Sequence, residues 1–292
     1  MKRETALESY YLGEHAIVVG GGVGGLSAAR ALSDSFRQVV ILDRDELPDH
    51  ATPRRGVPQG RQPHGLLGGG LKALEQLFRG FGNELSLVGA VPIDWGDMLY
   101  EIPGQDPWPR MKFGRQTYAM SRPLIELTLR RQVERLTNVK VQGRCRVLNI
   151  IGESNTGAAT GICYRTPEGN VESLRSDLVI DASGNGSLTL EFLRASGRRM
   201  PEETSTGVNM RYASALFNHT DIRDNYKIAY TLPNAPEESR GGLILPAENK
   251  SYQVVLIGRG EDIPQLRKVS SGGMLVSSGR RPSIMRSRMP SA

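Results

Sequence analysis

The segment from residue 16 to residue 30 constrains the fold more than any other part of the 292-residue chain. It reads AIVVGGGVGGLSAAR, a short apolar run that ends in glycines and is followed by small and apolar residues. Such an apolar run is typical of a strand buried on both faces of a parallel sheet. The residues after the glycines have helical spacing. The segment therefore predicts a strand, a tight turn and a helix at the start of an α/β sheet.

Three glycines in this turn fit the pattern G-x-G-x-x-G. Gly20 permits the tight turn, Gly22 allows the backbone to approach a pyrophosphate, and Gly25 lets the helix pack close to the sheet. The phosphates would meet the free N–H groups and the positive dipole at the helix N-terminus. The pattern therefore predicts a dinucleotide site.

A second apolar run, residues 38–42, ends at Asp43, which lies 23 residues after Gly20. An acidic side chain at this place accepts hydrogen bonds from an adenosine ribose in Rossmann βαβ units. Because strand, turn, helix, second strand and acid occur in order, we interpret the segment as such a unit. The alternative is a glycine-rich turn in an unrelated α/β protein.

Further elements are expected from periodicity and turn residues. Residues 71–78 and 123–136 have helical spacing, and residues 48–70 are expected to form a loop. The prolines between residues 93 and 114 favour irregular structure or edge strands. Strands are expected at residues 139–147, 159–165, 171–174, 178–180, 208–217 and 252–258, and residues 241–245 are expected to pair with the last of these.

The charge of the chain is concentrated near its end. There are 37 Lys and Arg against 31 Asp and Glu, and six of the basic residues lie between residues 267 and 292, where no acid occurs. Without these six the two counts are equal. The tail has no aromatic residue for base stacking, so we expect a disordered basic tail at residues 264–292 and no specific nucleic-acid partner.

Composition is ordinary for a globular protein, with 38% hydrophobic and 23% charged residues. No apolar run approaches the roughly 20 residues that span a bilayer, and the N-terminus lacks the apolar core of a signal peptide. Cys145 and Cys163 give neither a disulfide framework nor metal-ligand spacing. We expect a cytoplasmic protein with small buried cysteines and no bound metal.

Three segments carry a family resemblance. RRGVPQGRQPHGLL at residues 54–67 resembles the loop after the second strand in flavoprotein monooxygenases related to aromatic hydroxylases, polyether epoxidases and squalene epoxidase. YAMSRPLIE at residues 118–126 resembles their S-R-P-L-E helix start. LVIDASGNGS at residues 178–187 resembles their D-x-x-G-x-x-S motif. The resemblance covers roughly residues 14–262, and such a set of motifs in order is more specific than one motif.

The resemblance implies that the dinucleotide is FAD. Arg122 would contact its ribityl or phosphate region, Asp181 and Gly184 would lie beside it, and Arg54 or Arg55 would neutralise phosphate or line the flavin pocket. The full set of candidate cofactor-binding residues is Gly20, Gly22, Gly24, Gly25, Asp43, Arg44, Arg55, Arg122, Asp181 and Gly184.

Each candidate also has a structural alternative. Arg54, Arg55 and Arg61 could belong to a solvated loop. Arg122 could form an ion pair with Glu126 on the same helix. The turn from Asp181 to Ser187 could be an ordinary helix N-cap. For three isolated side chains, a packing role is favoured over a role in catalysis or substrate binding: His64, Trp95 and Trp108.

The resemblance also implies a reaction. In this family NAD(P)H reduces FAD, and the reduced flavin uses oxygen to oxygenate an apolar organic substrate, so the protein needs no catalytic side chain of its own. The chain has a single dinucleotide fingerprint, which leaves a partner reductase as an alternative electron source. The substrate would lie on strands that carry Met210, Tyr212 and Phe217.

The domain organisation follows from the same resemblance. We expect an FAD-binding domain of residues 14–90 and 118–200, interleaved with a β-rich substrate domain of residues 91–117 and 201–263. The fold class is α/β, with a Rossmann-type parallel sheet.

The sequence departs from the family after residue 261. Family members carry a later Gly-Asp flavin motif, and no Gly-Asp pair follows Gly186 here. We therefore expect a chain that lacks the C-terminal part of the family. A non-catalytic FAD-binding remnant and a prenyl-reductase-like enzyme remain alternatives. A halogenase is disfavoured, because the W-x-W-x-I-P motif of flavin halogenases is absent from the sequence.

Overall fold

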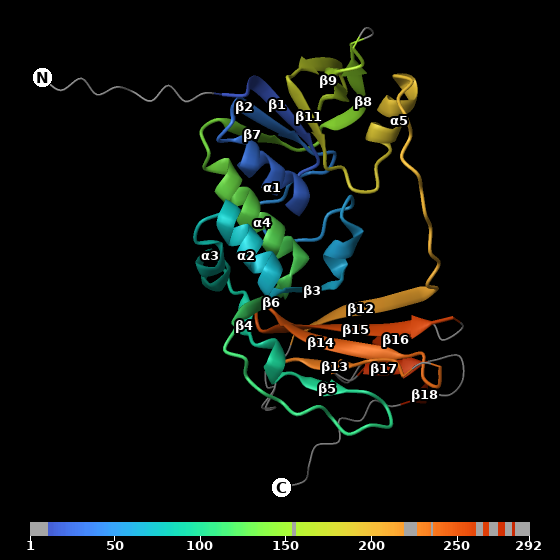
Figure 1. Ribbon diagram of the computed structural model, residues 1–292. Coiled ribbons are helices and arrows are strands. Elements are labelled where there is room, and N and C mark those ends of the chain that lie inside the picture. Colours follow the sequence, from blue (N-terminus) through green and yellow to red (C-terminus); the bar gives the residue numbers. More distant parts are fainter. Residues whose placement is uncertain are drawn as a thin grey trace, which may run out of the picture. The chain divides into compact units, whose positions relative to one another are not determined.

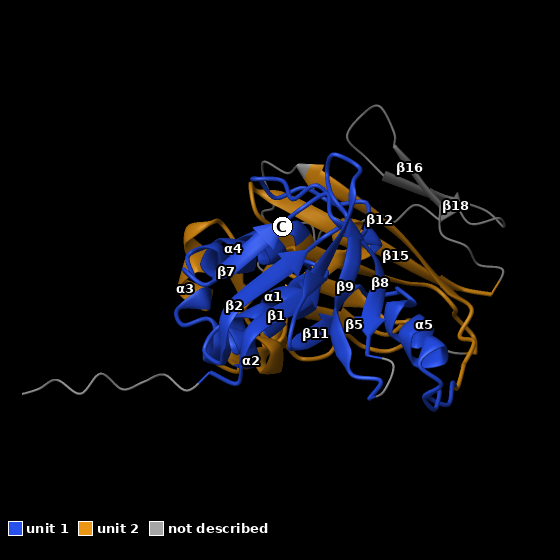
Figure 2. Ribbon diagram, turned by 90° about the horizontal axis from the view of Figure 1, so that it is seen from above, with its two compact units in different colours: residues 1–58, 73–81, 123–203 blue, residues 59–72, 82–122, 204–292 orange. Residues whose placement is uncertain are grey.

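The computed structural model describes residues 11–153, 156–218, 227–234 and 236–260, and the backbone of three short strands beyond them. The chain forms two compact units, coloured separately in Figure 2. Unit 1 comprises residues 1–58, 73–81 and 123–203, and unit 2 comprises residues 59–72, 82–122 and 204–292. Residues 59–72, 82–90 and 118–122, which we assigned from the sequence to the FAD-binding domain, belong to unit 2.

Unit 1 is built on a parallel four-stranded sheet in the order β11-β1-β2-β7 (Figure 1). Its strands are β1 (Gly13–Val19), β2 (Phe36–Leu42), β7 (Val139–Gln142) and β11 (Leu178–Asp181). Val19 lies opposite both Leu42 and Asp181, so three strands end at the same edge of the sheet. The expected α/β class and its parallel sheet are confirmed.

Helix α1 (Val23–Leu32) follows β1 after the turn at residues 20–22 and packs on β1 and β2. Helix α4 (Arg122–Glu134) matches the amphipathic segment expected from residue 123, with proline in its first turn. Helix α5 (Leu188–Ala195), which we did not predict, packs on the second sheet of unit 1.

That second sheet is antiparallel, in the order β10-β9-β8. Its strands are β8 (Arg146–Gly152), β9 (Ala159–Arg165) and β10 (Val171–Arg175). The expectation of one strand over residues 139–147 was wrong, because β7 and β8 belong to different sheets. Between them the chain turns around the end of β2: Arg144 has a φ of 57°, and its N–H donates to the Asp45 carbonyl at 2.8 Å.

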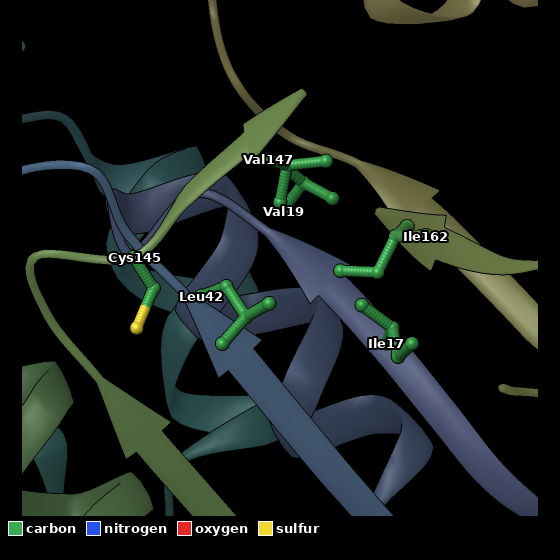
Figure 3. Packing of buried hydrophobic residues seen from close by; sticks show 6 residues of the cluster. All are labelled: Ile17, Val19, Leu42, Cys145, Val147 and Ile162. Atoms are coloured by element: carbon green, nitrogen blue, oxygen red, sulfur yellow. The ribbon is translucent and has the colours of Figure 1, made fainter. Parts of the chain in front are cut away.

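One hydrophobic cluster of unit 1 lies between its two sheets (Figure 3). Side chains alternate along β1, so Ile17 and Val19 face the antiparallel sheet while Val18 faces α1. Ile17 and Ile162 are 1% and 0% exposed. Full burial of one such side chain contributes about 1.5–3 kcal/mol to stability, and this layer fixes the edge at which the glycine turn emerges.

Unit 2 contains a five-stranded sheet in the order β12-β15-β14-β13-β5. Its strands are β5 (Leu99–Glu101), β12 (Met210–Asn218), β13 (Ala229–Thr231), β14 (Gly241–Ala247) and β15 (Ser251–Arg259). The expected pairing of β14 with β15 is confirmed as an antiparallel hairpin. Strand β5 is an edge strand, in agreement with the interpretation of the proline-rich segment.

A three-stranded antiparallel sheet, β3-β6-β4, completes the described core of unit 2. Its strands are β3 (Pro63–Leu66), β4 (Val91–Ile93) and β6 (Thr117–Ser121). The expected loop at residues 48–70 therefore contains a strand, preceded by a short 3₁₀ turn (Pro58–Arg61). The other helical segments are α2 (Gly68–Leu77), α3 (Phe81–Leu87) and the 3₁₀ turn Trp95–Asp97.

The predicted tail at residues 264–292 lies mostly outside the described residues. Within it the backbone forms strands β16 (Gln265–Lys268), β17 (Met274–Ser277) and β18 (Pro282–Ser283), and disorder of the remainder stays a prediction. None of the helices that the structure describes is long and apolar enough to cross a membrane.

Candidate functional site

The glycine turn between β1 and α1 contains two positions that admit no side chain. Gly20 has a φ of +104°, and a Cβ there would lie 2.5 Å from the Ala182 carbonyl oxygen. A Cβ on Gly25 would lie 1.8 Å from the Gly20 carbonyl oxygen. These two glycines are therefore required by the protein itself, as the tight turn and the close helix packing predict.

Gly22 and Gly24 differ from them. Among the described residues, the only atom within 4 Å of a Cβ built on Gly22 is Glu126 Oε1 at 3.8 Å, and none lies within 4 Å of a Cβ built on Gly24. Gly22 caps α1 without a side-chain hydrogen bond, and the first turn of α1 contains no acidic residue. The turn thus leaves open space beside helix N–H groups that have no side-chain acceptor, an arrangement suited to an anion.

Asp43 lies directly after β2 with 6% of its surface exposed. Its Oδ2 atom accepts the Gly21 N–H at 2.6 Å, and its Oδ1 atom accepts the Asp45 N–H at 2.8 Å. The carboxylate is therefore held against the glycine turn. Two carboxylate oxygens offer about four acceptor positions, so a ribose hydroxyl could still bind.

Arg54 joins the glycine turn to three carboxylates, which the sequence did not reveal. Its Nη1 atom lies 3.1 Å from Asp43 Oδ1 and 3.2 Å from Asp45 Oδ2, and its Nη2 atom lies 3.0 Å from Glu126 Oε2. Only 8% of the Arg54 side chain is exposed. Burial alone would lower the pKa of Arg54, but Asp43, Glu126 and Asp45 outweigh it and raise that pKa.

The other loop arginines have different surroundings. Arg44, Arg55 and Arg61 are exposed, as expected for a solvated loop. The solvated alternative is wrong for Arg54. The partner of Arg54 on α4 is Glu126, the residue that we considered as an ion-pair partner of Arg122.

A small cavity lies beside Arg54, lined among others by Gly21, Pro48, Glu126 and Arg130. Its volume is about 20 Å³, which is enough for one water molecule and too small for a nucleoside. A second cavity, of about 380 Å³, lies in unit 2 and is lined in part by Val91, Lys227 and Tyr252. None of the candidate cofactor-binding residues lines this second cavity.

Asp181 ends β11 at the same sheet edge as the glycine turn. Its Oδ1 atom accepts the Ser183 N–H at 3.0 Å, and its Oδ2 atom accepts the Thr189 N–H at 3.2 Å and the Thr189 hydroxyl at 2.7 Å. Burial raises the pKa of Asp181, but these bonds outweigh it and the pKa is lowered. Asp181 therefore binds the first turn of α5 through Thr189, whereas the N-cap residue of that helix, Ser187, makes no side-chain cap hydrogen bond. Gly184, with a φ of +75°, is exposed.

The remaining predicted residues lie in unit 2. Arg122 begins α4 and is partly buried. The His64 Nδ1 atom lies 2.9 Å from the Gln62 carbonyl oxygen, so this ring forms a local hydrogen bond in β3. Trp95 packs on the cluster around Ile93, whereas Trp108 is 56% exposed and stands edge-on to Tyr100 with a centroid distance of 4.9 Å.

The three residues that we predicted to lie beside the substrate, all on β12, do not share one face of the strand. Met210 and Tyr212 are exposed and share one face. Phe217 lies on the opposite face because side chains alternate along a strand. Tyr230 and Tyr100 stand edge to face at 5.8 Å, and burial, followed by the neighbouring Tyr100 and Tyr212, raises the pKa of Tyr230. One face of this sheet is therefore rich in tyrosine.

The two cysteines are reduced. Cys145 is buried in the core of unit 1, and burial raises the pKa of its thiol. Cys163 on β9 is partly buried. The expectation of small packed side chains holds for Cys145.

No family model matches the chain. Among curated proteins, Protein Rv3254 of Mycobacterium tuberculosis is 32% identical over 219 residues, which are 71% of this chain and 46% of that protein. The chain thus spans about half the length of the curated relative it matches.

Solved structures with a similar fold are FAD-dependent halogenases and monooxygenases. The myxobacterial chondrochloren halogenase CndH is 19% identical, with a TM-score of 0.59 over 85% of this chain and 54% of that chain. PqsL of Pseudomonas aeruginosa, a probable FAD-dependent monooxygenase, is 12% identical, with a TM-score of 0.60 over 84% and 61%.

A third neighbour, p-nitrophenol 4-monooxygenase PnpA of Pseudomonas putida, is 15% identical, with a TM-score of 0.61 over 86% of this chain and 58% of that chain. At these identities the similarity concerns the fold. The chain has the mixed α/β fold, with a parallel sheet, that these FAD-dependent proteins share.

Proposed function

We propose that the chain binds FAD through the glycine turn of unit 1 and belongs to an oxidoreductase, a monooxygenase acting on an apolar organic substrate with O2 and NAD(P)H. The observation that carries this proposal is the turn itself. Gly20 and Gly25 are needed for its shape, whereas a Cβ at Gly22 or Gly24 would meet no described atom closer than 3.8 Å. Asp43 is held against the same turn by the Gly21 N–H.

The residues present fit the cofactor. The pyrophosphate would accept hydrogen bonds from N–H groups at the start of α1, whose first turn contains no acidic residue. Asp43 would accept a ribose hydroxyl, and Arg122 would contact the ribityl or phosphate region. The bound flavin would supply the redox chemistry, and the chain would hold and orient it.

The comparisons support the proposal as analogies. The neighbours' titles name FAD-dependent monooxygenases and halogenases, and fold alone does not decide between reactions. The chain covers only about half of these proteins. The apolar substrate and the NAD(P)H electron donor are therefore proposals.

Replacement of Gly22 tests cofactor binding. A Cβ at this position would be in ordinary contact with Glu126 Oε1 at 3.8 Å, so we expect Gly22→Leu to fold and to lose FAD, because its side chain fills the space of the pyrophosphate. Gly69→Leu is the matched control, since Gly69 is an exposed helical glycine with no neighbour within 4 Å of its Cβ position. Quenching of the fluorescence of added FAD measures the FAD affinity of both variants. Full FAD binding by folded Gly22→Leu would refute the pyrophosphate assignment.

Flavin absorbance, recorded with NADPH under nitrogen and then in air, tests the reaction class. The absorbance bands of the FAD-loaded chain should bleach with NADPH under nitrogen and return in air. Bands that do not respond to NADPH but bleach with a flavin reductase would assign electron delivery to a partner. Bands that respond to neither would favour a non-catalytic FAD-binding chain.

A further inference from the structure

Asp43, the predicted ribose ligand, follows β2 on a backbone that is held at both of its polar groups. Its N–H donates to the Gln142 carbonyl at 2.9 Å, and its carbonyl accepts the Cys145 N–H at 2.8 Å. The side chain therefore leaves a fixed backbone position, and its own contacts decide which way its two oxygens face.

The carboxylate of Asp43 has about four acceptor positions, and the described residues fill three of them. The Oδ1 atom accepts the Asp45 N–H at 2.8 Å and a hydrogen bond from Arg54 Nη1 at 3.1 Å, so both of its positions are used. The Oδ2 atom accepts the Gly21 N–H at 2.6 Å and keeps one position. While Arg54 is in place, a ligand hydroxyl therefore binds at Oδ2.

Arg54 is itself held in place by its other contacts. Its Nη1 atom lies 3.2 Å from Asp45 Oδ2, and its Nη2 atom lies 3.0 Å from Glu126 Oε2 on α4 and 3.5 Å from the Gly21 carbonyl oxygen. The guanidinium is planar and donates in fixed directions. Arg54 therefore ties the Asp43 carboxylate to α4 and to the glycine turn.

We propose that Arg54 is a positioning residue for cofactor binding: it holds Oδ1 of Asp43, so that Oδ2 receives a single hydroxyl of the adenosine ribose. This inference rests on the proposed function, in which Asp43 binds the ribose of FAD. Arg54 acts through Asp43 and needs no contact with the cofactor. All of the residues that carry the inference belong to unit 1.

Analogues of ADP, which is one half of FAD, test this placement on the original chain by displacing bound FAD. ADP should bind about tenfold more tightly than 2′,3′-dideoxy-ADP, which lacks the hydroxyl that donates to the carboxylate. Of 2′-deoxy-ADP and 3′-deoxy-ADP, one should bind like ADP and the other like the dideoxy analogue, because Oδ2 has one position. Equal losses for these two analogues would overturn the proposal.

Replacement of Arg54 by lysine keeps the positive charge and loses the planar fork. In Arg54→Lys the preference for ADP over 2′,3′-dideoxy-ADP should fall from about tenfold to about threefold or less. Equal weakening of both ligands, with an unchanged preference, would overturn the proposal and would fit a direct contact of Arg54 with phosphate. Arg37→Lys is the matched control and should keep the original preference, because Arg37 is an exposed arginine of β2 paired with Glu14.

A double-mutant cycle with Asp43→Ala provides a second test. If Arg54 acts through Asp43, Arg54→Lys should cost almost no further FAD affinity once Asp43 is replaced. Additive losses would overturn the proposal. If Arg54→Lys does not fold, Asp45→Ala, which removes one of the carboxylates that hold Arg54, takes its place in both measurements with the same outcomes. An original chain that binds no FAD would instead refute the proposed function, and this inference with it.

Discussion

At the scale of single residues, Arg54 forms ion pairs with three carboxylates of the candidate site. Its guanidinium is buried among Asp43, Asp45 and Glu126, and one of these is the predicted ribose ligand. The sequence could not show this network, because Arg54 is separated by 11, 9 and 72 residues from the three acids. Only the fold brings them together.

Removal of Arg54 should destabilise the apoprotein. Arg54→Met removes the guanidinium that three largely buried carboxylates share, so the free energy of unfolding should fall by about 3–5 kcal/mol. Arg55→Met at the neighbouring exposed position should change it by less than about 0.5 kcal/mol. Urea denaturation of both variants measures the difference, and equal small effects would mean that the Arg54 network contributes little.

Asp181 gives a pH dependence of stability. Its pKa is lowered in the folded chain, so its contribution is complete above the unfolded pKa, about 3.9, and is lost as the pH falls through the folded value. Asp181→Asn should therefore be less stable than the original chain at pH 7 and equally stable below the folded pKa. A constant difference at every pH would contradict the assignment of the lowered pKa to the bonds from Ser183 and Thr189.

A substitution at Gly24 should have opposite effects on the stability of the apoprotein and on its affinity for FAD. Gly24→Ala in α1 meets no atom within 4 Å and should stabilise the apoprotein by up to about 1 kcal/mol, because alanine favours helix more than glycine. If a phosphate approaches Gly24, the same change should weaken FAD binding. Thermal unfolding with and without FAD shows both effects, and an unaltered FAD affinity would remove Gly24 from the cofactor site.

At the scale of secondary structure, the buried parallel strands were the easiest elements to predict, because strands covered on both faces are continuous apolar runs. Helix α5 was missed because Leu188, Leu190 and Phe192 alternate with polar residues, which is a strand pattern. The break between β7 and β8 was missed because apolar alternation continues across it. The turn there depends on contacts with residues 43 and 45.

Substitutions at two neighbouring residues of the turn between β7 and β8 should change the stability of the chain in opposite directions. A Cβ on Gly143 would lie 2.9 Å from the Asp45 carbonyl oxygen, so Gly143→Ala should destabilise the chain by about 1–3 kcal/mol. Arg144→Gly should stabilise it by about 1 kcal/mol, because φ of 57° suits glycine and the lost Glu46 ion pair is exposed. Chemical denaturation measures both, and the same sign for the two variants would contradict this account of the turn.

At the scale of the whole molecule, the chain forms two units, and each is built from three segments that alternate along the sequence. The sequence predicted the class and the parallel sheet, and its motifs indicated the flavoprotein fold that the comparisons support. Unit boundaries at residues 59–72 and 82–90 were not predicted, because these loops contain few periodic residues and join unit 2 through long-range pairing such as that of β3 with β6.

A titration of the purified chain with FAD tests the central claim most directly. Saturable quenching of flavin fluorescence, together with a shifted flavin absorbance spectrum, is the predicted result, and folded Gly22→Leu should abolish it. Flavin that keeps its free fluorescence and spectrum at every protein concentration, in the presence of the folded original chain, would contradict the account.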